Sequence, residues 1–319
     1  MKKLFILLAF ISIGTSWSQK SIQDIECITK LGGTRFVTLL SDNSVWWSVA
    51  EEPWSEVPRT GLPTDKKIAS IHVYLKLNLL SADSTLIAVL DDSTLWWFND
   101  NKWESIPNKS IKPDTKIKMF KPYVKFGSFG GTETRFFMLS SDNTLWWSAP
   151  DENFKPIDKS GLPANVEITN ISTYQKFGMM GGSETRYVVT LADNTVWWYA
   201  DGKKWEKTET DGLPSGFKIA NMTTYLKTSM MGGPSASEGR LVLQLEDNSV
   251  WWKAAKDKGW RSLETGGLPK GQKIKSLEIY QKFTSSSGTR VILVFEDNSI
   301  WWYAEKQGWQ KFELKNLLK

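Results

Sequence analysis

Cysteine and histidine are almost absent from this sequence, which contains one of each, Cys27 and His72. A single cysteine cannot form an intramolecular disulfide, so packing must stabilise the fold instead. A single histidine excludes most nucleophilic triads and most histidine-based metal sites. The sequence also lacks a Cys-x-x-Cys pair, a phosphate-binding loop and a dinucleotide-binding fingerprint. We therefore expect neither a metal nor an organic cofactor.

Long apolar runs are also missing, apart from one at the N-terminus. Two lysines precede an apolar stretch over residues 4–13, which is too short to span a membrane. This pattern predicts a signal peptide over residues 1–18, cleaved near Ser18–Gln19, and a secreted protein (extracellular or periplasmic) with no membrane insertion. The alternative of a lipoprotein signal needs a cysteine directly after the cut, whereas Cys27 lies nine residues beyond Ser18.

An excess of charge of one sign is missing too. Removal of the predicted signal leaves 301 residues with 38 basic and 35 acidic side chains, spread evenly along the chain. A net charge this small and dispersed argues against a nucleic-acid partner. The length is sufficient for one large domain.

Tryptophan, in contrast, is abundant, and 12 of the 18 residues form six adjacent pairs. The steps between pairs are 50, 50, 51, 54 and 50 residues, and an aspartate stands four residues before each pair. Repeats of this length with strand-like content are typical of propeller blades. We predict an all-β, six-bladed β-propeller with four antiparallel strands per blade, its repeats being 19–63, 64–113, 114–163, 164–214, 215–269 and 270–319.

The pattern inside each repeat predicts how the blades pack. The second segment is an almost continuous apolar run, such as residues 291–295, as expected for a strand covered on both faces. Adjacent residues of a strand point to opposite faces, so one tryptophan of each pair should pack, buried, toward each neighbouring blade. The Asp-Asn-Ser/Thr triplets predict tight hairpin turns. The two termini should meet between blades 1 and 6, with no strand exchanged between them.

An arginine opens the second strand in five repeats, 11 residues before the first tryptophan: Arg35, Arg135, Arg186, Arg240 and Arg290. The aspartate that precedes each tryptophan pair follows seven residues after the arginine, which is roughly 23 Å of extended strand at about 3.3 Å per residue. The arginines and the Asp-Asn turns should therefore lie on opposite faces of the ring.

Repeats three to five carry additional features at the arginine. Each has a glutamate two residues earlier, giving the pairs Glu133/Arg135, Glu184/Arg186 and Glu238/Arg240. Each also has a glycine-rich apolar loop, and two of these loops contain the methionines Met179, Met180, Met230 and Met231. The charged pairs fit either surface ion pairs or a ligand site. The methionines fit either packing under a neighbouring blade or an adaptable binding surface.

The run Thr-Arg-x-x-x-x-Leu-x-Asp-Asn-Thr/Ser-Val-Trp-Trp resembles propeller repeats of the regulator-of-chromosome-condensation type, although the Gly-Gln-Leu-Gly element of that family is missing. The tryptophan content and the repeat length also resemble the tectonin and fucose-lectin group of secreted propellers. In six-bladed fucose lectins an arginine, a glutamate and an aromatic ring hold sugars between blades. The resemblance implies polar roles for the three Glu/Arg pairs and suggests Phe154, Trp205 and Trp260 as the rings.

These patterns favour a lectin-like protein that binds a glycan or cell-surface polysaccharide. Two other functions stay open at this point. One is a protein-interaction scaffold that uses the methionine-rich loops of blades 3–5. The other is a polysaccharide lyase or glycosidase, because 35 acidic residues always offer carboxylate pairs. We consider an enzyme the less favoured of these, because no single repeat carries a distinctive acidic insertion.

Overall fold

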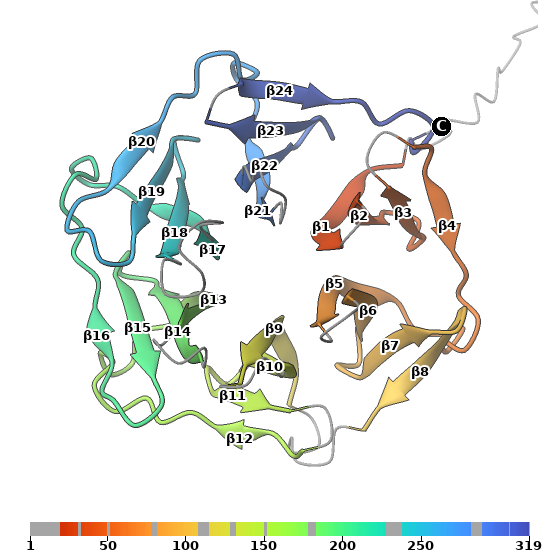
Figure 1. Cartoon of the computed structure of the whole chain (residues 1–319), viewed down its shortest axis with the longest axis horizontal. Helices are drawn as coiled ribbons and strands as arrows, with labels where there is room; N and C mark the ends of the chain where they lie inside the picture. The colour runs from red at the N-terminus through yellow and green to blue at the C-terminus, as the bar shows by residue number, and fades with distance from the viewer. Residues whose placement is uncertain are drawn as a thin grey trace, which may run out of the picture.

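The structure is a computed structural model in which six four-stranded antiparallel sheets are arranged as a ring (Figure 1). It describes residues 20–30, 33–49, 52–77, 82–107, 115–127, 132–149, 152–177, 183–227, 238–281, 289–305 and 307–318. Each sheet is one blade, formed by four consecutive strands in the order of the chain. The predicted six-bladed β-propeller is therefore confirmed, and among the described strands none is exchanged between blades 1 and 6.

The strands of the first three blades have the following bounds. Blade 1 contains β1 (Ile22–Lys30), β2 (Gly33–Leu40), β3 (Val45–Val49) and β4 (Ser55–Val57). Blade 2 contains β5 (Ile68–Leu77), β6 (Ala82–Leu90), β7 (Leu95–Asn99) and β8 (Lys102–Ile106). Blade 3 contains β9 (Ile117–Phe126), β10 (Thr132–Ser140), β11 (Leu145–Ser148) and β12 (Lys155–Pro156).

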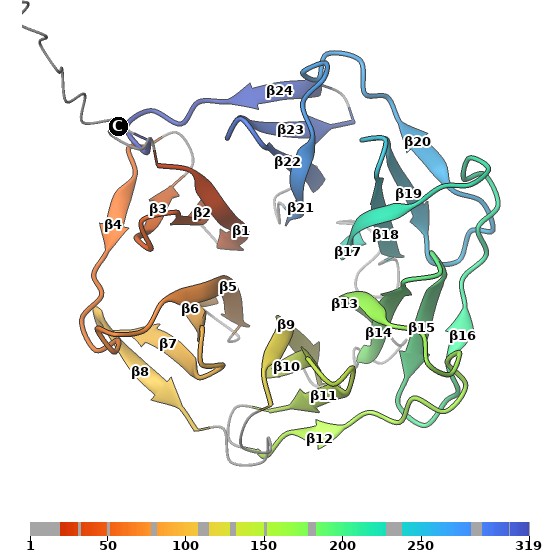
Figure 2. The same ribbon diagram turned by 180° about the vertical axis from the view of Figure 1, so that it is seen from behind.

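The other three blades repeat this arrangement. Blade 4 contains β13 (Ile168–Phe177), β14 (Ser183–Leu191), β15 (Val196–Ala200) and β16 (Glu206–Lys207). Blade 5 contains β17 (Ile219–Lys227), β18 (Glu238–Leu245), β19 (Val250–Ala254) and β20 (Arg261–Leu263). Blade 6 contains β21 (Ile274–Gln281), β22 (Thr289–Phe295), β23 (Ile300–Ala304) and β24 (Gly308–Phe312). The first strands of the six blades together surround the ring axis, and the fourth strands lie at the rim (Figures 1 and 2).

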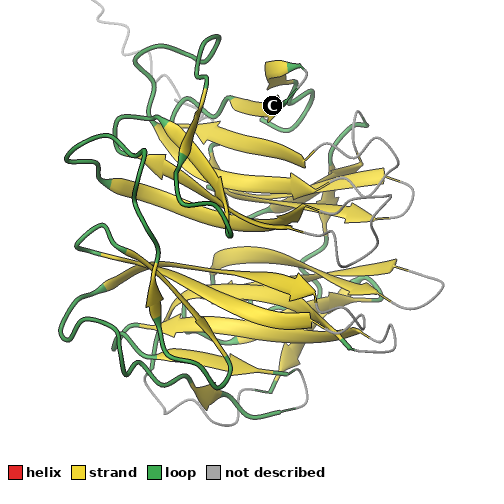
Figure 3. Cartoon of the chain, turned by 60° about the vertical axis from the view of Figure 1, so that its left-hand side comes forward, coloured by secondary structure: helices red, strands yellow, loops and turns green. Residues whose placement is uncertain are grey.

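Every blade has two ends, because its strands run between the two faces of the ring (Figure 3). The second and third strands are joined at one end, which we call the turn end. The arginine of the second strand lies at the other, which we call the Arg end. In blade 3, for example, Arg135 is near the start of β10, whereas Asp142 follows the end of this strand. The predicted separation of arginines and Asp-Asn turns is confirmed.

The turn end has nearly the same structure in all six blades. An aspartate oxygen accepts the backbone N–H two residues later at 2.9–3.1 Å, and the residue after the aspartate has a φ of 64–69°. Asparagine tolerates this left-handed conformation better than most residues, and it occupies the position in five of the six blades. A serine or threonine hydroxyl also accepts a hydrogen bond from the indole N–H of the first tryptophan, as in Trp46 to Ser44 at 2.8 Å and Trp197 to Thr195 at 2.8 Å.

The residue at this left-handed position also attaches each blade to the next, and it is an asparagine at five junctions and Ser93 between blades 2 and 3. Ile168 N–H donates to the Asn143 side chain at 2.9 Å, and Ile219 N–H donates to Asn194 at 2.9 Å. The ring closes by the same contact, because Ile22 N–H donates to Asn298 at 2.8 Å. The hairpin triplet thus holds the blades together in addition to turning the chain, which the sequence pattern alone did not predict.

The two tryptophans of each pair point to opposite neighbours, as predicted. Trp147 of blade 3 and Trp197 of blade 4 pack against the apolar cluster between these blades, and the other five junctions have the same arrangement. The prediction that both indoles are buried is wrong, because all of these side chains are only half-buried. The tryptophans lie on the third strand from the ring axis. Because the blades are arranged radially, neighbouring sheets move apart with distance from the axis, so each indole is covered only in part. The fully buried residue is the one before each pair, such as Leu145 or Val196, both 0% exposed.

Candidate functional site

Five arginines lie over tryptophan rings at the Arg end. Phe137 of β10 is paired with Trp147 of the adjacent strand β11. Arg135 lies two residues before Phe137, so its side chain is on the same side of the sheet. The guanidinium therefore reaches the ring of the second tryptophan, which attracts cations electrostatically. The distances to the ring centroid are 5.2, 4.8, 4.0, 4.3 and 3.9 Å for Arg35–Trp47, Arg135–Trp147, Arg186–Trp198, Arg240–Trp252 and Arg290–Trp302.

The predicted glutamates lie beside three of these arginines. The shortest ion-pair distances are 2.8 Å for Arg135–Glu133, 2.9 Å for Arg186–Glu184 and 3.2 Å for Arg240–Glu238. Residues two apart on a strand share a side, which explains the contact. Burial alone would lower the pKa of Arg135, but the hydrogen bond that it donates to Glu133, together with the Glu133 charge and the nearby tyrosines, outweighs burial and raises this pKa. Each pair is thus a fixed set of donors and acceptors at the end of a blade.

Two lysines that the sequence interpretation missed complete these pairs in blades 4 and 5. Lys203 contacts Glu184 at 2.9 Å, and Lys256 contacts Glu238 at 2.9 Å. Both lie in the loop between the third and fourth strands. Burial opposes ionisation of Glu184 and Glu238, but hydrogen bonds to the lysine and the arginine lower the pKa of both carboxyl groups. The lysines have no fixed spacing from the arginine motif, so the repeat pattern gave no signal for them.

The predicted aromatic rings of the fourth strands are located elsewhere. Phe154, Trp205 and Trp260 are only 7%, 5% and 4% exposed, and all three belong to apolar clusters between blades. Trp205 and Trp260 donate their indole N–H to carbonyls of the preceding blade at 2.8 and 2.9 Å. The resemblance predicts that these rings contact a ligand, whereas the structure places them in the contact between blades. The second tryptophans do supply partly exposed rings at the Arg end.

A tyrosine of the first strand faces the same part of the junction in blades 3, 4 and 5. Tyr123 shares a hydrogen bond of 2.8 Å with Tyr187 of the next blade, and Tyr225 accepts one of 3.3 Å from Arg240. Tyr174 packs against Gly239 of the next blade. Burial raises the pKa of both Tyr123 and Tyr174 to about 12, so these phenols stay protonated at neutral pH. The predicted methionines Met179, Met180, Met230 and Met231 lie outside the described residues.

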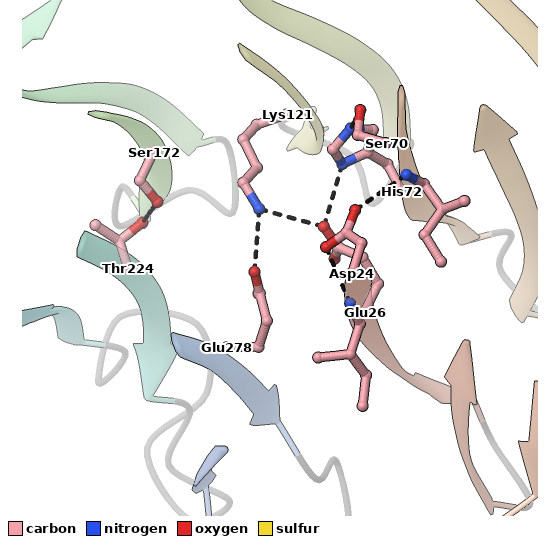
Figure 4. Close-up of polar contacts among 10 residues, drawn as sticks. Asp24, Glu26, Ser70, His72, Lys121, Ser172, Thr224 and Glu278 are labelled. Carbon is pink, nitrogen blue, oxygen red and sulfur yellow. Dashed lines mark hydrogen bonds and ion pairs between the residues drawn. The ribbon is translucent and has the colours of Figure 1, made fainter. Parts of the chain in front are cut away.

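A second polar cluster lies at the axis and was not predicted (Figure 4). Lys121 of blade 3 contacts Glu26 of blade 1 at 3.2 Å and Glu278 of blade 6 at 3.4 Å. His72 of blade 2 contacts Glu26 at 3.1 Å through Nδ1, and its Nε2 lies 2.9 Å from the Ser70 hydroxyl. Four blades are therefore joined through one ion-pair network.

Burial controls protonation in this axial cluster. Burial, opposed by Lys121 and supported by Glu26, raises the pKa of Glu278 to about 7. Burial and the Glu26 charge raise the pKa of Asp24 to about 6. Burial and the Lys121 ammonium lower the pKa of His72 to about 3, so the imidazole is neutral. A neutral ring donates a hydrogen bond from Nδ1 to Glu26 and accepts one from the Ser70 hydroxyl at Nε2.

Two kinds of site are absent from the part of the chain that the structure describes. It contains no group of three or more histidine, cysteine, aspartate or glutamate side chains arranged to hold a metal ion. Within the same residues, no helix is long and apolar enough to cross a membrane. The Glu/Arg pairs beside half-buried tryptophans make the Arg ends of blades 3–5 the strongest candidate for a functional site.

Comparison with known proteins gives a likeness of fold. No protein-family model and no curated protein matches the sequence. Among solved structures, the Aleuria aurantia lectin in complex with Fucα1-6GlcNAc matches with a TM-score of 0.61 and 11% identity, over 91% of this chain and 94% of the lectin. A structure of the same lectin described by its six-bladed β-propeller fold matches with a TM-score of 0.60 and 11% identity, over 92% and 95%. The BBS1N chain in complex with ARL6DN matches with a TM-score of 0.54 and 11% identity, over 94% of both chains. The chain therefore resembles the lectin propellers in fold.

Proposed function

We propose that this protein is an exported carbohydrate-binding propeller that holds glycans between neighbouring blades at the Arg ends of blades 3–5. The observation that carries the proposal is the repeated set of a glutamate, an arginine and a half-buried tryptophan in three consecutive blades. Guanidinium N–H groups donate to sugar hydroxyls, and the carboxylate accepts from them. The partly exposed indole offers an apolar surface for the C–H face of a sugar.

The structural neighbours support this proposal at the level of fold. The Aleuria aurantia lectin is described as fucose-specific, and one of its structures contains α-methyl-L-fucoside. We propose a glycan or cell-surface polysaccharide as the partner of this chain as well, without assigning fucose as the sugar. Export rests on the basic and apolar N-terminal stretch, and intact-mass measurement of the secreted protein should give a chain that begins at Gln19.

A glycan array with neutral and acidic sugars tests the binding function. We expect retention of at least one glycan that is recovered unchanged after prolonged incubation. Cleavage of the bound glycan would instead identify a lyase or glycosidase. Absence of binding to every glycan would contradict the proposal and favour the scaffold function.

Calorimetry with arginine variants tests the location of the sites. Arg135→Ala, Arg186→Ala and Arg240→Ala should each weaken binding of the glycan found on the array, because each removes the donor of one site. Arg35→Ala is the matched control, since Arg35 also lies over a tryptophan but has Gly33 where the other three blades have glutamate. Equal losses in all four variants would show that the arginines serve a structural role or that every blade binds alike.

A further inference from the structure

The arginine of blade 4 differs from its equivalents in its hydrogen bonds. Arg135 and Arg240 donate from Nε to their glutamates at 3.0 and 3.2 Å. Arg186 donates to Glu184 from Nη2 at 2.9 Å, and its Nε is buried without an acceptor among the described residues. The Arg186 side chain is only 6% exposed. A buried charged donor without a partner is costly and rare in native proteins, so it indicates a position for an acceptor that comes from elsewhere.

A glycine in the neighbouring blade accompanies this difference. The residue before the arginine position is threonine or serine in five blades, and Gly239 in blade 5. A Cβ atom at position 239 would lie 2.2 Å from Cδ2 of Tyr174, so the tyrosine ring occupies space that only glycine leaves free. In blade 5 the equivalent Tyr225 instead accepts a hydrogen bond from Arg240 at 3.3 Å. Gly239 thus lets Tyr174 lie against blade 5.

The second tryptophan of blade 4 is also less covered by cations than its equivalents in blades 3 and 5. Lys155 lies 4.9 Å from the Trp147 ring and Arg261 lies 5.1 Å from the Trp252 ring, in addition to the arginine of each second strand. The residue paired with Trp198 on the fourth strand is Glu206. Within the described residues, Arg186 is the only cation over Trp198, at 4.0 Å. The outer part of this ring is therefore the better surface for a sugar.

The acceptor beside Arg186 already has a second partner. Glu184 is 32% exposed, and its other carboxylate oxygen contacts Lys203 at 2.9 Å. The glutamate can therefore turn toward a ligand hydroxyl and keep an ion pair while it uncovers the guanidinium edge. A ligand carboxylate at this edge would lie beside the Glu184 carboxylate, which disfavours it by like-charge repulsion.

We propose that the junction between blades 4 and 5 is the principal binding site and takes a neutral vicinal diol. One hydroxyl oxygen accepts from Arg186 Nε, the adjacent hydroxyl donates to Glu184, and the C–H face of the sugar packs on Trp198. This inference rests on the proposed glycan-binding function and adds a rank among the three sites and a charge class for the ligand.

The test follows the Nε–H signals of the seven arginines by NMR in the unmodified protein, assigned with Arg→Lys variants. The probes are L-fucose, D-galactose, D-mannose and D-glucuronate, titrated separately. We expect a neutral sugar to shift the Arg186 signal at about tenfold lower concentration than the signals of Arg135 and Arg240, since a hydrogen bond to a charged group contributes at least this factor. D-glucuronate should shift the Arg186 signal only at higher concentrations than the neutral sugars do.

Two outcomes separate this inference from the function on which it rests. If the Arg135 or Arg240 signal responds first or together with Arg186, or if glucuronate is preferred, the rank or the charge class is wrong while glycan binding stands. If no arginine signal responds to any probe and the array is negative, both proposals fail. Gly239→Thr introduces a residue found at this position in other blades. It should raise the sugar concentration needed to shift the Arg186 signal about tenfold, and it should leave the concentration needed at Arg135 unchanged. An unchanged Arg186 response in a folded Gly239→Thr variant would contradict the role of this glycine.

Discussion

The turn end and the Arg end of the blades differ in how uniform they are. At the turn end, the aspartate contact recurs in all six blades and the left-handed residue recurs with it. At the Arg end, blade 2 has Thr85 in place of arginine, and the glutamate is confined to blades 3–5. Uniform positions satisfy a requirement that every junction shares, namely assembly of the ring. Positions that vary between equivalent blades are free of that requirement, so they are where a binding function can be specified.

The largest expected effect concerns the buried aromatics of the fourth strands. Trp260→Ala should lower the free energy of unfolding by about 3–5 kcal/mol, because it removes a buried indole and its bond to the preceding blade. Trp251→Ala, at a half-buried position of the same blade, is the control and should cost less. Urea unfolding followed by fluorescence measures both. Equal costs would mean that exposure does not distinguish the two tryptophan classes.

A smaller effect should follow from loss of the contact between a turn and the next blade. Asn194→Gly keeps access to the φ of 64° but removes the acceptor for Ile219 N–H, and should cost about 1–3 kcal/mol. Asn194→Asp retains an acceptor oxygen and should cost less. Thermal unfolding of the two variants measures the difference. A glycine variant as stable as the aspartate variant would show that this turn acts on its own blade only.

The axial cluster should give a pH dependence that neither end of the blades shares. The pKa of Glu278 is raised from 4.5 to about 7, so the folded state binds more protons than the unfolded state in this window. Its contribution is fully present below about pH 4.5 and is lost as pH rises through 7. His72, with its pKa lowered from 6.5 to about 3, acts oppositely, losing its contribution as pH falls below 6.5. Melting temperatures of Glu278→Gln should lack the decline between pH 6.5 and 7.5 that the unmodified protein shows, and an identical decline in both would exclude Glu278 as its source.

The smallest effect on stability is expected at the exposed lysine of the Arg end. Lys203 is 48% exposed, so Lys203→Ala should change the free energy of unfolding by less than about 1 kcal/mol. The same variant should alter glycan affinity at the junction between blades 4 and 5, because Glu184 loses its second partner. Chemical unfolding and calorimetry on one preparation give both values. A large loss of stability with unchanged affinity would place Lys203 in assembly rather than in binding.

The sequence predicts the parts of this molecule that depend on repetition. Pairs of tryptophans at a regular interval indicate blades, and the seven residues between Arg135 and Asp142 separate the two ends. Burial was predicted less well, because alternation along a strand shows which way Trp197 points but not how far the neighbouring sheet is from it. The fourth-strand ring of Trp260 was assigned to the ligand by resemblance, whereas it lies in the contact between blades.

The axial cluster was missed for a different reason. Glu26, His72, Lys121 and Glu278 occupy equivalent positions in four first strands, as their pairing with Val37, Ile87, Phe137 and Ile292 shows. Their residue types differ, so a search for recurring residues does not find them. A comparison of what differs at one register position would have revealed two carboxylates, a lysine and a histidine facing the axis.

The closure of the ring has a consequence for how the chain is made. Ile22 binds Asn298, which lies 276 residues later in the sequence. Asn316 contacts the backbone of Trp54 at the same junction. At the junction between blades 4 and 5, the equivalent backbone N–H of Trp260 donates to the Asp211 carbonyl instead. At synthesis rates of about 5–20 residues per second, the partner of Ile22 emerges from the ribosome roughly 14–55 s after it. Throughout that interval the face of blade 1 that will meet blade 6, including Ile25 and Trp54, has no native cover, which makes it the surface on which a chaperone has the longest time to act.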